Sequence, residues 1–182
     1  MKNQVNRKSS IFFLMLIILF VTRSMAQSNE LVVIDSNYSQ KQQVLDHLAS
    51  GIPVFEVNAP KNPWESIRQY LEQSRSTQVV HLFANANYNA MELGGKTYDA
   101  DAVDQEFELS MLEGLFQGIH IQLLIYDCNL GSNPEGLALL KKISDKAYLN
   151  IAVPTNCSSI FGADLDFDHT TMNQPVNNSI FK

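Results

Sequence analysis

Short apolar runs alternate with helix-like segments along this chain, and this alternation constrains its fold more than any other feature. Five runs read as buried strands: 31–34, 52–57, 77–84, 119–126 and 148–153. Strands that are separated by helices require crossover connections, which join parallel strands and bring the helices onto the faces of the sheet. The pattern therefore predicts a three-layer α/β fold with a mostly parallel sheet and helices on both faces.

The helices expected between the runs begin and end at residues with known terminal preferences. We expect them to span 39–48 with Ser39 as the N-cap, a segment opening at Pro63, 99–116 with Asp99 or Asp101 as the cap, and 134–147. In the third helix the apolar residues follow a helical spacing: Val103, Phe107, Met111, Leu112 and Leu115. Gly94-Gly95 between two short strands predicts a β-hairpin insertion after the third strand of the sheet.

The first 26 residues have the pattern of a secretory signal peptide. Lys2, Arg7 and Lys8 precede the apolar stretch 11–21, which is followed by small residues up to Ala26. The stretch is shorter than the roughly 20 residues that span a bilayer. We therefore expect cleavage near Ala26 and an exported protein, periplasmic or extracellular, without a membrane anchor.

The remaining residues, 27–182, are enough for a single domain with a sizeable core. The segment 1–26 contains four basic and no acidic side chains, so its removal changes the formal net charge from −6 to −10. Such an acidic chain argues against nucleic acid and anionic membranes as partners. No cofactor is expected.

Cys128 follows the apolar run 119–126 and opens a polar loop. Parallel sheets place ligands and nucleophiles at this carboxyl end of their central strands. The neighbouring run, 77–84, is followed by Asn85, where a Cys/His pair would need a histidine. A carboxamide cannot take a proton from a thiol. The sequence thus predicts a binding cleft without a catalytic base, formed by residues from these two strand ends: Asn85, Asn87, Asp127, Cys128 and Asn129.

Six segments give the chain a resemblance to a known family: ELVVIDSNY, IPVFEV, VVHLFAN, MELGGKTYD, LLIYDCNLG and ADLDFD. In this order they resemble the bacterial domain of unknown function 4347 (DUF4347), over roughly residues 30–168. The resemblance implies a caspase-like fold and a place in large exported, adhesin-like proteins. It implies no established activity.

The resemblance also bears on the site. Its pattern reads His-x-x-Ser-His-Gly on strand three, where His81 matches the first histidine and residues 84–86 are Ala-Asn-Ala. On strand four the pattern reads Tyr-Gly-Cys, and residues 126–128 are Tyr-Asp-Cys. The histidine that would act as the base is thus replaced by Asn85. Asp127 beside Cys128 would raise the pKa of the thiol.

No other histidine is well placed to act as the base. His81 lies inside its strand and is expected to be a core residue. His47 belongs to the first helix, and His120 begins its strand at the end opposite Cys128. His169 follows a run of alternating aspartates, and sequence does not fix its position relative to the site.

Asp164, Asp166 and Asp168 alternate with Leu165 and Phe167. The DxDxD spacing invites a calcium-site interpretation, but an EF-hand glycine and glutamate are missing. We expect a final strand with the two apolar residues facing inward, and no metal site.

The second cysteine, Cys157, follows the run 148–153 and should emerge at the same sheet edge as Cys128. Adjacent strands lie close enough for a bridge, and paired cysteines of exported proteins are usually oxidised. We therefore expect a Cys128–Cys157 disulfide, which would exclude nucleophilic chemistry at Cys128.

Three hypotheses follow. The first is an exported, non-catalytic, pseudoenzyme-like module that binds a protein or peptide partner of unknown identity. The alternative is a cysteine peptidase-like hydrolase that uses Cys128 with an unorthodox base. The third is a structural fragment of a larger adhesin.

Overall fold

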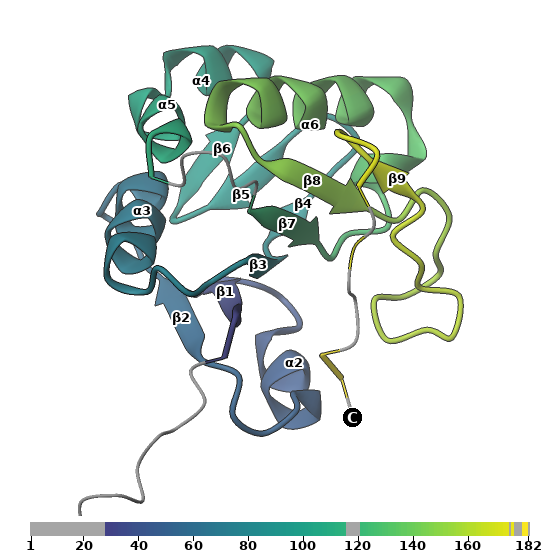
Figure 1. Ribbon diagram of the computed structural model, residues 1–182. Helices are drawn as coiled ribbons and strands as arrows, with labels where there is room; N and C mark the ends of the chain where they lie inside the picture. The colour runs from purple at the N-terminus through teal and green to yellow at the C-terminus, as the bar shows by residue number, and fades with distance from the viewer. Residues whose placement is uncertain (1–27, 116–120, 175, 177–179, 182) are drawn as a thin grey trace, which may run out of the picture.

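A computed structural model describes residues 28–115, 121–174, 176 and 180–181, and in them the main sheet has the strand order β2-β1-β3-β7-β8-β9 (Figure 1). Its strands are β1 Glu30–Asp35, β2 Val54–Val57, β3 Val79–Phe83, β7 Gln122–Ile125, β8 Asn150–Val153 and β9 His169–Thr170. All neighbouring strands are parallel except β8 and β9. The predicted mostly parallel sheet is confirmed. The leader expected at 1–26 lies outside the described residues.

The helices lie on both faces of this sheet, as expected. α3 (Pro63–Gln73), α4 (Ala100–Gln105), α5 (Phe107–Glu113) and α6 (Pro134–Ala147) contribute to the hydrophobic cluster on one face. α2 (Lys41–His47) packs on the other face through Val44, beside the loop between β8 and β9 and the carboxyl-terminal residues Ile180 and Phe181. The molecule is therefore a three-layer α/β structure.

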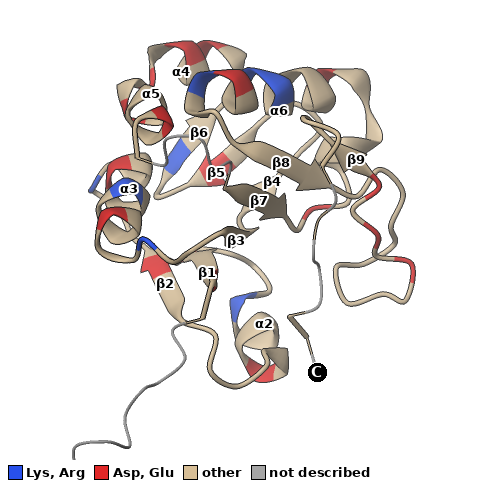
Figure 2. Cartoon of the chain, viewed as in Figure 1, with Lys and Arg blue, Asp and Glu red and all other residues tan. Residues whose placement is uncertain are grey.

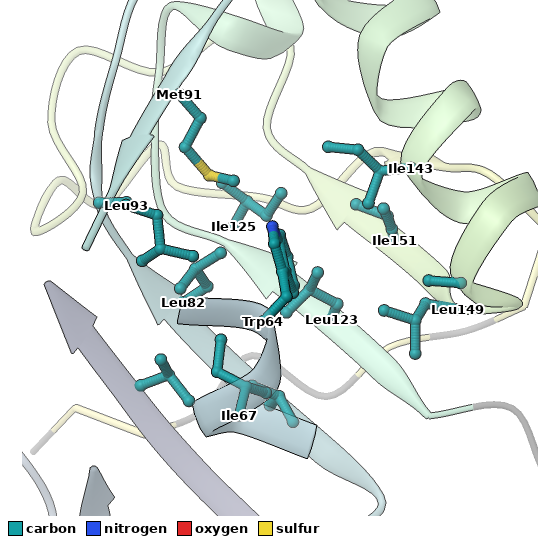
Figure 3. Close-up of a cluster of buried hydrophobic side chains, with 14 of the residues drawn as sticks. Trp64, Ile67, Leu82, Met91, Leu93, Leu123, Ile125, Ile143, Leu149 and Ile151 are labelled. Carbon is teal, nitrogen blue, oxygen red and sulfur yellow. The ribbon is translucent and has the colours of Figure 1, made fainter. Parts of the chain in front are cut away.

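The larger core cluster fills the space between the sheet and the four helices (Figure 3). Trp64 and Ile67 of α3 pack there with Leu82 and Leu123 of the sheet and with Ile143 of α6. Side chains alternate along each strand, so the two faces of a strand enter different clusters. Both faces are covered, which explains why the parallel strands read as continuous apolar runs.

The hairpin predicted after the third strand of the sheet is present and is part of a second, three-stranded antiparallel sheet. Its strands are β4 Asn85–Ala86, β5 Met91–Leu93 and β6 Lys96–Tyr98. Gly94 and Gly95 turn the chain with φ of +61° and +75°, values that glycine adopts without strain. The Gly94 N–H donates to Asp35 Oδ2 at 2.5 Å, which ties the hairpin to the end of β1.

The single helix expected over 99–116 is wrong. The chain leaves the helical conformation at Glu106 and forms α4 and α5 on either side of it. The Glu106 carboxylate accepts hydrogen bonds from Tyr98 Oη at 3.0 Å, from Asn62 Nδ2 at 2.9 Å and from Glu108 N at 3.2 Å. These contacts, two of them with other parts of the chain, fix the break.

The break also changes which apolar residues are buried. Val103, Leu109 and Leu112 enter the core, whereas Phe107 and Met111 are 67% and 43% exposed. The last residues of the expected helix, and the start of the expected strand at 119–120, lie outside the described residues.

Three smaller expectations also need correction. The cap position of α2 is Gln40, without a side-chain cap, rather than Ser39. β8 begins at Asn150 because Tyr148 adopts a left-handed conformation, with φ of 57°, that ends α6. Residues 164–168 form a loop, and the final strand is His169–Thr170.

The two apolar residues of that loop face inward as expected, because Phe167 is buried and Leu165 packs against the same hydrophobic cluster. Two of the aspartates bond to the loop itself: Asp164 accepts from Ser158 N at 2.9 Å and Asp168 from Thr155 N at 2.8 Å. These residues are therefore held by hydrogen bonds between loop segments and not by the strand pairing that the sequence predicted.

Candidate functional site

A cleft of about 380 Å³ lies at the carboxyl edge of the parallel sheet. The loops that follow β1, β3, β7 and β8 supply its walls. Its lining consists of Tyr38, Ser39, Gln40, Asn85, Ala86, Tyr126, Asp127, Cys128, Asn129, Cys157, Ser158, Ser159 and Ile160.

The cleft occupies the topological switch point of the sheet. After β1 the chain runs through α2 to β2, which lies on one side of β1. After β2 it runs through α3 to β3, which lies on the other side of β1. The loops after β1 and β3 therefore diverge, and open α/β sheets bind ligands in the crevice that this divergence creates. The location agrees with the strand-end cleft expected from sequence.

Asn85, which directly follows β3, uses both ends of its carboxamide. Its Oδ1 accepts a hydrogen bond from Ser39 N at 3.2 Å, and its Nδ2 donates to Asn37 O at 3.1 Å. The side chain thereby fastens the end of β3 to the loop between β1 and α2. It shapes the wall of the cleft, and it carries no proton-accepting group of suitable basicity.

Asp127 organises the loop after β7. Its Oδ1 accepts from Asn129 N at 2.8 Å and from Leu130 N at 2.7 Å, which starts the short 3₁₀ helix η1, Leu130–Ser132. Burial raises the pKa of the nearby Tyr38 phenol, and the negative charge of Asp127 raises this pKa further. Tyr38 is therefore neutral at physiological pH, and it donates to Gln40 Oε1 at 3.1 Å.

Cys128 and Cys157 form a disulfide whose Cα atoms lie 5.3 Å apart. The bond joins the loops after β7 and β8, as the sequence predicted, and both sulfur-bearing residues line the cleft. In this state Cys128 has no thiol to titrate or to attack a substrate.

His81 is fully buried in the middle of β3, which confirms that it is a core residue. Its Nδ1 lies 3.0 Å from Tyr126 Oη, while its Nε2 has no hydrogen-bond partner in the described structure. Burial lowers the pKa of the imidazole to about 4. His81 does not line the cleft.

Asn87 also lies outside this cleft, contrary to expectation. It lines a smaller neighbouring hollow beside the three-stranded sheet, and its Oδ1 accepts from Asn89 N at 3.0 Å and from Ala90 N at 2.8 Å. His47 lies on α2 and His169 on β9, and neither lines the cleft. Among the described residues, no group of three or more His, Cys, Asp or Glu side chains is arranged to hold a metal ion.

Sequence reasoning missed the contributions of two loops to the cleft. Tyr38, Ser39 and Gln40 come from the loop after β1, and Ser158 and Ser159 from the loop after β8. The strand order that creates the switch point would have identified the first loop. That order is not fixed by the alternation of strands and helices alone.

Comparison with protein families places the chain in one of them. The family model described as "Domain of unknown function (DUF4347)" matches residues 31–173. No curated protein and no solved structure matched the chain. In the part of the chain that the structure describes, no helix has the length and apolar character needed to cross a membrane. Since the family match covers most of the sequence, the chain belongs to the DUF4347 family.

Proposed function

We propose that this protein is an exported, non-catalytic module that binds a protein or peptide partner in the strand-end cleft. A leader ending near Ala26 directs export, and residues 27–182 form a single domain. The disulfide supports the export part of the proposal, because such bonds persist in oxidising compartments. The basic and apolar pattern of residues 1–26 supports it independently.

The observation that carries the proposal is the state of the two residues at the strand ends. The Cys128 sulfur is bonded to Cys157, and the Asn85 carboxamide is bonded to the backbone of residues 37 and 39. Neither group is available for acid–base or nucleophilic chemistry. The cleft between them is nevertheless open and has the size of ligand sites, which are typically about 300–1,000 Å³. Binding is the function that uses this arrangement.

Thiol chemistry tests the non-catalytic part. We expect the protein recovered from the exported fraction to have lost residues 1–26 by mass, and to take up alkylating reagent at Cys128 and Cys157 only after reduction. Rapid alkylation of Cys128 without reduction, faster than that of Cys157, would instead favour the cysteine peptidase-like hydrolase.

Selection from a displayed library of random peptides tests the binding part. The informative variant is Asn129→Trp, because Asn129 is exposed at the cleft and its replacement fills the space without removing a side-chain hydrogen bond found in the structure. Asn156→Trp is the matched control, since Asn156 is exposed in the loop after β8 but does not line the cleft. We expect the protein and the control to enrich the same peptides and Asn129→Trp to lose them. Equal enrichment by all three would refute binding in this cleft.

A further inference from the structure

The four loops that line the cleft, after β1, β3, β7 and β8, carry negative charge only. The segments 36–40, 84–90, 126–133 and 154–168 contain four aspartates and neither lysine nor arginine. Figure 2 shows this for the loop between β8 and β9, where acidic positions occur without basic ones. An edge with uncompensated carboxylates has a negative potential, which attracts cations and repels anions.

Asp127 brings this charge into the cleft, and among the described residues that line the cleft it is the only charged one. Its Oδ1 is occupied by the N–H groups of Asn129 and Leu130, but among the described residues no donor reaches its Oδ2. The residue is half-buried. A carboxylate oxygen that is partly removed from water and lacks a donor gains most from a charged hydrogen-bond donor.

The rest of the lining suits a side chain that is apolar along its length and polar at its end. The Cys128–Cys157 bridge and the small exposed parts of Tyr38 and Ile160 offer apolar surface, and Gln40 and Asn129 offer amide oxygens. Lysine and arginine have this amphipathic form, with a methylene stem and a cationic head.

From these observations we infer that the partner inserts an arginine or lysine side chain into the cleft, with its cationic head at Asp127 Oδ2 and its stem along Tyr38 and the disulfide. The inference rests on the proposed binding function and specifies the chemistry of the partner. It makes Asp127 the residue that determines specificity. The aspartates of the 154–168 loop contribute a general attraction at the rim.

Binding of short acetylated and amidated peptides that differ only at their central residue tests this inference. The central residue is arginine, its neutral isostere citrulline, or glutamate, and binding is followed by NMR titration of the protein. We expect the arginine peptide to bind about tenfold more tightly than the citrulline peptide, which corresponds to about 1.4 kcal/mol. The glutamate peptide should bind most weakly.

Two variants locate the effect. Asp127→Asn removes the charge but keeps the oxygen that accepts from residues 129 and 130, so the loop should retain its conformation. Asp166→Asn removes the same charge from an exposed residue outside the cleft. We expect Asp127→Asn to abolish the preference for arginine over citrulline and Asp166→Asn to preserve most of it.

The outcomes separate this inference from the function on which it rests. If the arginine and citrulline peptides bind equally and Asn129→Trp weakens both, the cationic specificity is wrong and binding in the cleft stands. If none of the peptides binds and the displayed library also yields no binders, both are wrong. If Asp166→Asn reduces the preference as much as Asp127→Asn, the attraction is a diffuse property of the rim, and insertion at Asp127 is refuted.

Discussion

Acidification should destabilise the fold through His81. The imidazole is fully buried between the sheet and the aromatic cluster that includes Tyr126, and burial lowers its pKa to about 4, from 6.5. A histidine whose folded-state pKa is depressed favours the native state most when it is neutral. Its contribution is therefore fully present above pH 6.5 and is lost as pH falls from 6.5 toward 4.

The size of the effect follows from the difference between the two pKa values. Each pKa unit corresponds to about 1.4 kcal/mol, so protonation of His81 should cost about 3 kcal/mol once the pH is below 4. Between pH 7 and pH 5 the unfolded imidazole becomes almost fully charged while the native one remains neutral. The loss in the free energy of unfolding over that interval should be about 2 kcal/mol.

Urea denaturation at pH 7 and pH 5 measures this loss, with the parent protein compared with His81→Gln. Gln cannot titrate, so its variant should lose about 2 kcal/mol less than the parent over the interval. Comparing pH changes cancels any constant destabilisation that the substitution causes. His47→Gln is the matched control, because His47 is exposed on α2. Equal pH slopes for the parent and His81→Gln would refute the assignment of acid sensitivity to the buried imidazole.

Four further variants test structural assignments by denaturant unfolding. The double variant Cys128→Ser/Cys157→Ser should have a free energy of unfolding about 3 to 4 kcal/mol lower than the parent, because the bond closes a loop with a sequence separation of 29. An unchanged free energy of unfolding would contradict a disulfide in the native protein. Asp35→Asn should lower the free energy of unfolding by about 1–3 kcal/mol. Both carboxylate oxygens of Asp35 accept from backbone N–H groups, and the amide nitrogen of Asn would face either the Gly94 N–H or the Asn37 N–H, donor against donor. Leu109→Ala should cost about 2–5 kcal/mol while Phe107→Ala changes stability by less than about 1 kcal/mol. A larger loss for Phe107→Ala than for Leu109→Ala would instead support the single continuous helix that the sequence predicted.

The sheet could be predicted from sequence because burial of both faces leaves a direct signature. Strands β1, β3, β7 and β8 are covered on both sides, so their apolar residues are continuous rather than alternating. The candidate disulfide followed from the same reasoning, since loops after adjacent parallel strands emerge at the same edge, where two cysteines can come within bridging distance. The hairpin followed from Gly94-Gly95, where both residues adopt positive φ.

The remaining features depend on contacts between distant residues. The apolar spacing over 103–115 is compatible with one helix, and only the bonds of Glu106 to Asn62 and Tyr98 show why the helix breaks. Likewise Ser39 is of a residue type that helices prefer at the N-cap, but its backbone N–H donates to the side chain of Asn85, which is 46 residues away. Periodicity and local preference do not contain this information, so the helix break and one wall of the cleft could not be predicted.

The residues at and beside the two strand ends also hold the walls of the cleft. Asn85 fastens the loop after β1, Asp127 fixes the turn after β7, and the Cys128–Cys157 bond joins that turn to the loop after β8. A cleft whose loops are fixed before binding loses less conformational entropy when a partner enters. The proposed binding function would benefit from these three contacts, which also stabilise the fold.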